Sequence, residues 1–326
     1  MPDPSRPLLE VSHLRTVFAR PHGAEAAAVD DVSFSVSRGE TLGLVGESGS
    51  GKSVTALSIV RLVAPPGRIA GGHILLDGID LTGLDEASMR QVRGRRIGFV
   101  FQEPMTALDP VYTVGAQIEE TLKVHGLATG RAAAARAVEL LGAVRIPEAS
   151  RRAREYPHQL SGGLRQRAMI ALALAAEPSL LIADEPTTAL DVTVQAEILD
   201  LLRDMRREFR LSMLLITHDL GIVAEMADRV VVMYGGRIAE EGLVRAVLDA
   251  PAHPYTRALL ASVPSGQPGV RPLAIAGQVP SIADRPAGCA FAPRCPDRFA
   301  PCGDLPPLVP VSDTHRASCF LHVPPR

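Results

Sequence analysis

The sequence of 326 residues contains almost no lysine and carries almost no net charge. Only Lys52 and Lys123 stand among its 34 basic residues, so arginine supplies nearly all positive charge and a retained lysine is informative. The formal net charge is -2 at pH 7. The field of the whole molecule therefore gives no reason to expect nucleic acid as a partner.

We also expect neither a membrane-spanning segment nor a secretory signal. The longest apolar stretch, residues 168–183, is interrupted by Glu177 and Pro178, so no segment offers the roughly 20 clean apolar residues of a membrane helix. The N-terminal residues 1–7 carry Asp3 and three prolines, with no apolar stretch behind them. We therefore expect a cytoplasmic protein, with a membrane-protein partner left open.

Cysteine is absent from the first 288 residues. All four cysteines lie near the C-terminus, at Cys289, Cys295, Cys302 and Cys319. This clustering indicates one site rather than scattered core thiols.

The apolar patterns predict an α/β fold with a mainly parallel core sheet. Residues 8–36 alternate like the paired strands of a β-rich edge, and TLGLVG, SLLIADE and SMLLITHD read as short buried strands next to helical patterns. An Ala-, Arg- and Leu-rich segment at about 103–165 predicts an inserted helical subdomain. We expect one main α/β domain over residues 1–250 and a loop-rich C-terminal module over residues 251–326.

A glycine-rich loop follows the TLGLVG strand and precedes a helical pattern. It fits the phosphate-binding pattern G-x-x-x-x-G-K-[ST] with Gly46, Glu47, Ser48, Gly49, Ser50, Gly51, Lys52 and Ser53. Glycines allow backbone N–H groups to point at phosphates, Lys52 supplies a compact charge, and Ser53 can ligate Mg²⁺. One of the two lysines lies in this loop, which favours nucleotide binding over a chance glycine-rich turn.

Two adjacent carboxylates end the next predicted strand. Asp184 is expected near a Mg²⁺ ion and Glu185 near an attacking water, where it would act as general base. Taken alone, two acids at a strand end are also common as solvated turn residues. The phosphate loop favours the catalytic interpretation.

The segment Leu160-Ser161-Gly162-Gly163-Leu164 opens the apolar helical pattern that follows it. It predicts a second anion site, although a capping serine with flexible glycines explains the same pattern. Together with the phosphate loop and the Asp-Glu strand, in this order, the segment resembles the LSGGQ-like signature of ABC ATPases. Leu164 stands where the general pattern has glutamine.

The resemblance implies further roles. In this family the signature, here Ser161, Gly162 and Gly163, closes on ATP held by a second subunit. Gln102 matches the glutamine that contacts Mg²⁺ beside Ser53 and Asp184, and His218 matches the histidine that orients water and γ-phosphate. The loop ending at Asp191 resembles the one that signals across the dimer, and Phe18 is the candidate for stacking on adenine.

Three stretches make the chain similar to the ATPases of oligopeptide and dipeptide permeases: residues 101–110, residues 253–260 and the Cys-rich end. That resemblance implies an ATP hydrolase on the cytoplasmic face of the cell membrane. Its expected partners are two membrane permease subunits, a related non-identical ATPase and an external solute-binding protein. Two alternatives remain: an importer ATPase for another solute such as nickel, or a soluble ABC ATPase outside transport.

The cysteines are spaced C-x5-C-x6-C-x16-C. A reducing setting disfavours two disulfides. Zinc sites usually contain a close C-x2-4-C pair, which this sequence lacks, whereas the ligands of an iron–sulfur cluster can lie further apart. Some peptide-permease ATPases carry a four-iron cluster in this region, so the resemblance points the same way. The hypothesis is a [4Fe-4S] centre, with zinc and free thiols as alternatives.

Overall fold

The computed structural model describes residues 6–20, 25–263 and 273–324. Residues 1–5 of the N-terminal segment, on which part of the localisation prediction rests, lie outside this range. Contacts divide the chain into two compact units. The first unit joins Met1–Thr82 to Leu215–Arg326, and the second comprises Gly83–Leu214.

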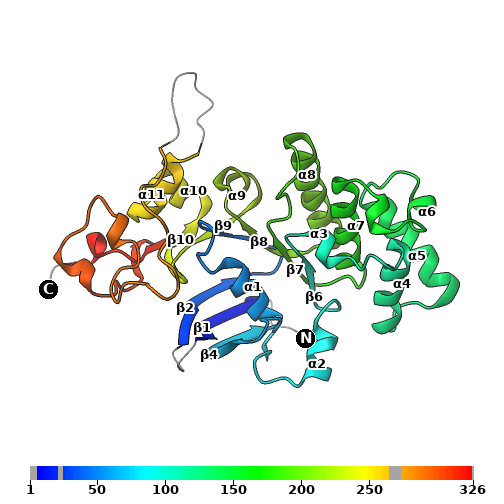
Figure 1. Cartoon of the computed structure of the whole chain (residues 1–326), viewed down its shortest axis with the longest axis horizontal. Helices are drawn as coiled ribbons and strands as arrows, with labels where there is room; N and C mark the ends of the chain where they lie inside the picture. Colours follow the sequence, from blue (N-terminus) through cyan, green and yellow to red (C-terminus); the bar gives the residue numbers. More distant parts are fainter. Residues whose placement is uncertain (1–5, 21–24, 264–272, 325–326) are drawn as a thin grey trace. The chain divides into compact units, whose positions relative to one another are not determined.

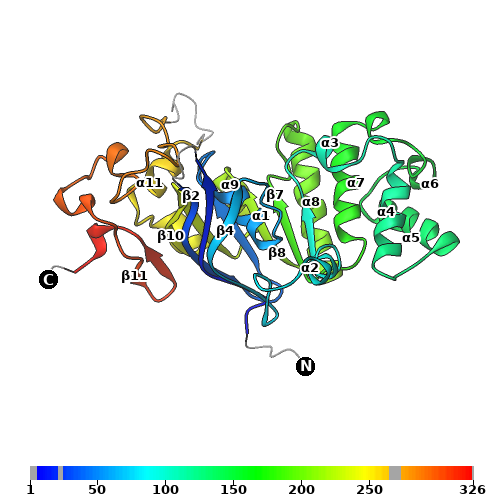
Figure 2. The same cartoon turned by 60° about the horizontal axis from the view of Figure 1, so that its bottom comes forward.

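The first unit begins with an antiparallel sheet in the strand order β2-β1-β4-β5. Buried and exposed residues largely alternate along β1, as expected of a strand with one face against a core. Figure 1 labels β2, β1 and β4 side by side, and Figure 2 shows β2 and β4 on either side of the dark blue strand β1. The predicted β-rich edge is thus confirmed, with bounds β1 Leu9–Ala19, β2 Glu25–Val36, β4 Gly67–Leu76 and β5 Ile79–Asp80.

A second group of strands forms the centre of the same unit. Strand β3 pairs in parallel with β9, and β9, β10, β12 and β11 follow one another in antiparallel pairs. The residues of β3 are all buried, which is why its sequence TLGLV is almost continuously apolar. The bounds are β3 Thr41–Val45, β9 Arg229–Tyr234, β10 Arg237–Leu243, β11 Val309–Ser312 and β12 His315–Ala317.

The C-terminal segment packs into the core of the first unit. Tyr255 and Phe291 are fully buried and share a hydrophobic cluster with Val230 and Val232 of β9. Strand β12 also pairs with β10, so strand pairing crosses the predicted boundary at residue 250. Three residues are too few to produce a readable alternation, which is why the sequence did not indicate this strand. The helices of the unit are α1 Lys52–Ile59, α9 Leu220–Met226, α10 Val244–Asp249, α11 Pro254–Ala261, and the 3-10 turns η3 Ala292–Arg294, η4 Ala300–Gly303 and η5 Phe320–His322.

The second unit combines two parallel strands with a helical region. Strand β6 (Ile97–Val100) pairs in parallel with β7 (Leu180–Asp184), and β8 (Ser212–Thr217) begins at the end of this unit. Figure 1 shows α4, α5 and α7 together, in agreement with their mutual contacts. The helices are α2 Glu86–Val92, α3 Pro104–Ala107, α4 Val114–Val124, α5 Gly130–Ala143, α6 Ala149–Arg152, η2 Pro157–Gln159, α7 Gly162–Leu174 and α8 Val192–Phe209.

Local signals explain these helices. Thr113 caps α4 by accepting a hydrogen bond from the N–H of Ala116. Along α8, Ile198, Leu201, Leu202 and Met205 are buried at three- and four-residue spacing. The expectation that segment 103–165 is helical is confirmed by α3 to α6. Among the described residues, no helix combines the length and the apolar character needed to cross a bilayer.

Candidate functional site

The glycine-rich loop of residues 46–53 connects β3 to α1, as its pattern predicted. Gly46 and Gly51 have φ of 154° and 103°, values that residues with a side chain rarely adopt. A Cβ on Gly46 would also overlap the carbonyl oxygen of Met233, and one on Gly51 would approach that of Ala28. Only glycine therefore allows the loop to close this tightly above α1.

Lys52 lies at the start of α1 with only 5% of its surface exposed. Its Nζ donates hydrogen bonds to the carbonyl oxygens of Gly46 (2.8 Å) and Glu47 (3.1 Å), which folds the loop around the ammonium group. The Oγ of Ser50 is buried without a hydrogen-bond partner among the described residues. A buried charge, an unpartnered hydroxyl and a helix N-terminus together suit a polyanion such as a nucleotide phosphate chain.

Two side chains from the C-terminal segment reach the same loop, and sequence reasoning did not predict them. Arg294 forms two hydrogen bonds with the carboxylate of Glu47, at 2.7 and 3.1 Å. The hydroxyl of Tyr255 accepts a hydrogen bond from the backbone N–H of Glu47 at 2.8 Å. More than 200 residues separate these partners in sequence, so no local pattern could have revealed them.

His218 and Phe18 belong to the same unit. His218 is exposed directly after β8, and the next residue, Asp219, caps α9 by accepting from the N–H of Gly221. Phe18 is half-buried on β1, where it pairs with Ala26 and Gly67 of the neighbouring strands. The adenine role of Phe18 stays a prediction.

In the second unit, the two carboxylates lie at the end of β7 as predicted. Asp184 is buried, with 5% of its surface exposed. Glu185 adopts the left-handed conformation, with φ of 45°, which turns the chain sharply after the strand. Its Oε2 accepts hydrogen bonds from Nε2 of Gln102 (3.2 Å) and from the hydroxyl of Thr188 (2.8 Å). The structure thus brings Gln102 and Glu185 together from separate segments.

The signature segment forms the start of α7. Ser161 caps this helix by accepting from the N–H of Leu164 at 3.4 Å, while Ser161 and Gly162 are exposed. Gly163 packs against Val194 of α8, and a Cβ there would come within 2.8 Å of that side chain. The capping interpretation and the anion-site interpretation are therefore compatible, since the cap leaves Ser161 and Gly162 exposed.

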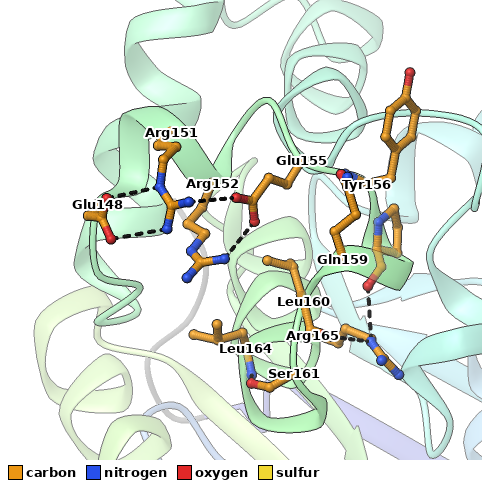
Figure 3. A network of polar contacts seen from close by, with 11 residues as sticks. Glu148, Arg151, Arg152, Glu155, Tyr156, Gln159, Leu160, Ser161, Leu164 and Arg165 are labelled. Carbon is orange, nitrogen blue, oxygen red and sulfur yellow. Dashed lines mark hydrogen bonds and ion pairs between the residues drawn. The ribbon is translucent and has the colours of Figure 1, made fainter.

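A polar network fixes the turn that precedes the signature (Figure 3). The Nε of Arg165 donates to the carbonyl oxygens of Pro157 (3.0 Å) and Leu160 (2.9 Å). One turn earlier, the N–H of Tyr156 donates to the side-chain oxygen of Gln159 at 2.8 Å. These bonds tie the first turn of α7 to the residues that precede it, which holds the exposed Ser161 and Gly162 in place.

The resemblance of residues 101–110 to permease ATPases also predicts that Met105 and Leu108 face a permease. The structure places these two residues differently. Met105 on α3 is 46% exposed, whereas Leu108 is 2% exposed. The expectation that both face a partner is therefore wrong for Leu108, which is a core residue. Asp191, just before α8, is exposed and caps that helix by accepting from the N–H of Val194 at 2.9 Å.

The four cysteines converge, as their clustering predicted. All of them line one cavity of about 10 Å³, close to the minimum volume for a single water. Burial raises the pKa of the Cys289, Cys295 and Cys319 thiols. Yet no three His, Cys, Asp or Glu side chains in the described part of the chain are placed to hold a metal ion. The side chains as arranged do not fit the predicted metal centre.

Two family models match the chain. A model described as ABC transporter matches residues 29–188. A second, described as oligopeptide/dipeptide transporter, C-terminal region, matches residues 239–302. These ranges contain the phosphate loop and the Asp-Glu strand in the first case, and α11 with three of the four cysteines in the second.

Curated relatives match over nearly the full length. A protein of Brucella melitensis, named as a candidate peptide import ATP-binding protein, is 53% identical, with 97% of each chain covered. One of the same designation from Brucella abortus is 51% identical, covering 98% of this chain and 95% of that one.

Solved structures resemble the fold. A dimeric ATP-binding cassette in a post-hydrolysis state with ADP and Pi is 30% identical, with a TM-score of 0.65 over 73% of this chain and 99% of that one. CbiO1 of Clostridium perfringens, part of the ABC transporter complex CbiONQ, is 27% identical, with a TM-score of 0.63 over 75% and 91%.

Proposed function

This chain belongs to the ABC transporter family, and from that premise we propose that it is the ATP-hydrolysing subunit of an importer of di- and oligopeptides. The observation that carries the peptide assignment is the match of residues 239–302 to the C-terminal region of oligopeptide and dipeptide transporters. The names of the Brucella relatives support the same substrate class.

Nucleotide binding is assigned to the loop of residues 46–53. Its backbone N–H groups and the ammonium of Lys52 would hold the phosphates, and Phe18 would stack on adenine. Ser53, Asp184 and Gln102 are the residues assigned to Mg²⁺. When bound, Mg²⁺ neutralises charge on the phosphates.

Hydrolysis is assigned to Glu185. Its carboxylate would accept a proton from the water that attacks the γ-phosphate, while the donors on Gln102 and Thr188 orient it. His218 would help to orient water and phosphate. In a dimer, Ser161, Gly162, Gly163 and Asp191 would face the nucleotide held by the other ATPase, consistent with the exposure of Ser161, Gly162 and Asp191.

The proposed partners are two membrane permease subunits, a related but non-identical ATPase and an external solute-binding protein. The chain would act at the cytoplasmic face of the membrane, attached through the permeases. The near-neutral charge gives no support to a nucleic-acid partner.

A four-iron cluster at the cysteines stays a hypothesis. The convergence of all four thiols on one cavity supports it, while the lack of any metal-holding group in the described residues speaks against it. No catalytic step depends on it.

The proposed function is tested by isolating the complex from its source membrane and identifying every chain. We expect the two permeases and a second ATPase, and ATP hydrolysis by the reconstituted complex that rises with peptide-loaded binding protein. Stimulation by Ni²⁺ in place of peptide would support the alternative solute. Recovery with ribosomes or DNA instead of permeases would overturn the transport assignment.

A further inference from the structure

The phosphate loop carries its own negative charge. Glu47 is the second residue of a loop whose expected ligand is a polyanion, and 26% of its side chain is exposed. An uncompensated carboxylate at this position would repel the phosphates and leave the loop free to move. The structure supplies a compensating partner, the guanidinium of Arg294, as a two-bond ion pair.

Besides its ion pair with Glu47, the side chain of Arg294 makes several other hydrogen bonds and ring contacts. Its side chain is 5% exposed. It donates to the carbonyl oxygens of Ala276 (2.9 Å) and Ile275 (3.3 Å) and to the hydroxyl of Tyr234 (3.2 Å). Its guanidinium lies 5.8 and 5.9 Å from the ring centres of Tyr234 and Phe291. Although burial alone would lower the pKa of Arg294, the hydrogen bonds to Glu47 and Tyr234 raise it, so the charge is permanent.

Tyr255 secures the backbone of the same residue. The hydroxyl accepts from the Glu47 N–H, and the ring is fully buried against Tyr234 and Phe291, with centroids 4.6 and 5.4 Å away. Burial raises the pKa of Tyr255, which keeps the phenol neutral. One residue of the loop is thus held at its side chain by Arg294 and at its main chain by Tyr255.

We propose that Arg294 and Tyr255 are positioning residues for nucleotide binding, through which the C-terminal segment sets the shape and charge of the phosphate loop. Arg294 neutralises Glu47 and Tyr255 fixes its N–H, so that the loop meets ATP in a prearranged conformation. The inference rests on the proposed ATPase function and deepens it. Neither residue belongs to the phosphate-binding pattern itself.

The test compares variants of the full chain by calorimetric titration with MgATP at constant salt. We expect Arg294→Ala to raise the Kd roughly tenfold or more, because a charged, two-bond partner is lost. The Kd of Arg294→Lys should lie between those of the unaltered chain and Arg294→Ala, because lysine keeps the positive charge but cannot form the two parallel hydrogen bonds of a guanidinium. Tyr255→Phe removes one neutral hydrogen bond and should raise the Kd roughly threefold.

A rescue experiment separates positioning from simple anchoring. Adding Glu47→Gln to Arg294→Ala removes the uncompensated carboxylate, so the double variant should bind MgATP more tightly than Arg294→Ala alone. Where hydrolysis is measured, KM for ATP should rise while kcat at saturating ATP stays within about twofold, because the hydrolytic groups are untouched. Arg257→Ala, which breaks an exposed ion pair with Asp297 in the same segment, is the matched control and should leave the Kd unchanged.

Each result has a defined meaning. If Arg294→Ala retains its melting temperature and its MgATP affinity, the inference is overturned. If its affinity falls but the double variant shows no recovery, Arg294 is an anchor only and the inference is equally overturned. If the unaltered chain fails to bind MgATP, the proposed function fails instead, which keeps the two failures apart.

Discussion

One lysine provides the point charge of the phosphate loop. Because Nζ of Lys52 is buried between two loop carbonyls, we predict that Lys52→Ala weakens MgATP binding. Lys52→Arg should also fail, since the planar fork does not fit a pocket shaped for an ammonium. Equilibrium titration measures both, with the exposed Lys123→Ala as the control that should bind normally. Normal affinity in either Lys52 variant would remove the loop from the nucleotide site.

A second residue-scale prediction concerns the assigned general base. Glu185→Gln keeps the shape and an oxygen to accept from Thr188, and it removes the group that accepts the proton. We expect hydrolysis to fall by at least about 10²-fold while ATP binding persists. Steady-state phosphate release and nucleotide titration measure the two quantities. Undiminished turnover would contradict the role, and the exposed Glu177→Gln should change neither value.

At the scale of elements, α11 depends on a neutral histidine. Burial lowers the pKa of His253 from 6.5 to about 3, with smaller contributions from Arg257 and His322. Its Nδ1 accepts from the N–H of Tyr255 at 3.0 Å, which caps α11. Below pH 6.5 the unfolded chain binds a proton that the folded chain does not, so folding loses stability as pH falls from 6.5 toward 3.

The free energy of unfolding should therefore depend measurably on pH. At pH 5 the loss from His253 should reach about 2 kcal/mol, because 1.5 pH units separate it from 6.5. His253→Asn can keep a cap and cannot titrate, so its unfolding free energy should fall less steeply between pH 6.5 and 5. Urea unfolding at several pH values tests this. If the unfolding free energies of both proteins fall equally with pH, the pKa of His253 is not lowered in the folded chain.

The four cysteines that line one cavity lead to another prediction at the scale of elements. Under the cluster hypothesis, anaerobically purified protein should be brown, absorb broadly near ~400 nm and contain iron and sulfide in equal amounts. The side chains as arranged favour colourless protein with four titratable thiols. Iron-free anaerobic protein whose stability is unchanged by Cys295→Ser would exclude the cluster.

At the scale of the whole molecule, hydrolysis must be coupled to a membrane partner. Met105 is exposed on α3 in a segment that the family resemblance places against the permease. We predict that Met105→Ala lowers peptide uptake by the reconstituted complex while ATP hydrolysis persists. The ratio of the two rates is the readout, and Val124→Ala, another exposed apolar residue, should not change it. A parallel loss of uptake and hydrolysis would contradict a coupling role.

Leu108 serves as the contrasting variant. It is buried, so Leu108→Ala should destabilise the fold by about 2–5 kcal/mol through loss of packing. Uptake and hydrolysis should then fall together, with a lower melting temperature. The sequence had grouped Leu108 with Met105, and only side-chain burial separates them.

The sequence by itself determined the features that depend on neighbouring residues. The path from strand β3 through the loop of residues 46–53 into helix α1 was predictable because the glycine-rich pattern and the flanking apolar runs are local. The Asp184-Glu185 strand end and the Ser161 cap were predictable for the same reason. The family followed from these motifs and their order, without any knowledge of contacts.

The tertiary structure decided what depends on residues far apart in the chain. The bonds from Arg294 and Tyr255 to Glu47 join positions more than 200 residues apart, and β12 pairs with β10 across a segment with no readable period. The cysteine spacing predicted convergence, but the orientation of the thiols depends on packing that spacing does not encode. Periodicity and motifs act over a few residues, whereas the partner of a buried charge is chosen by the fold, because only burial makes pairing obligatory.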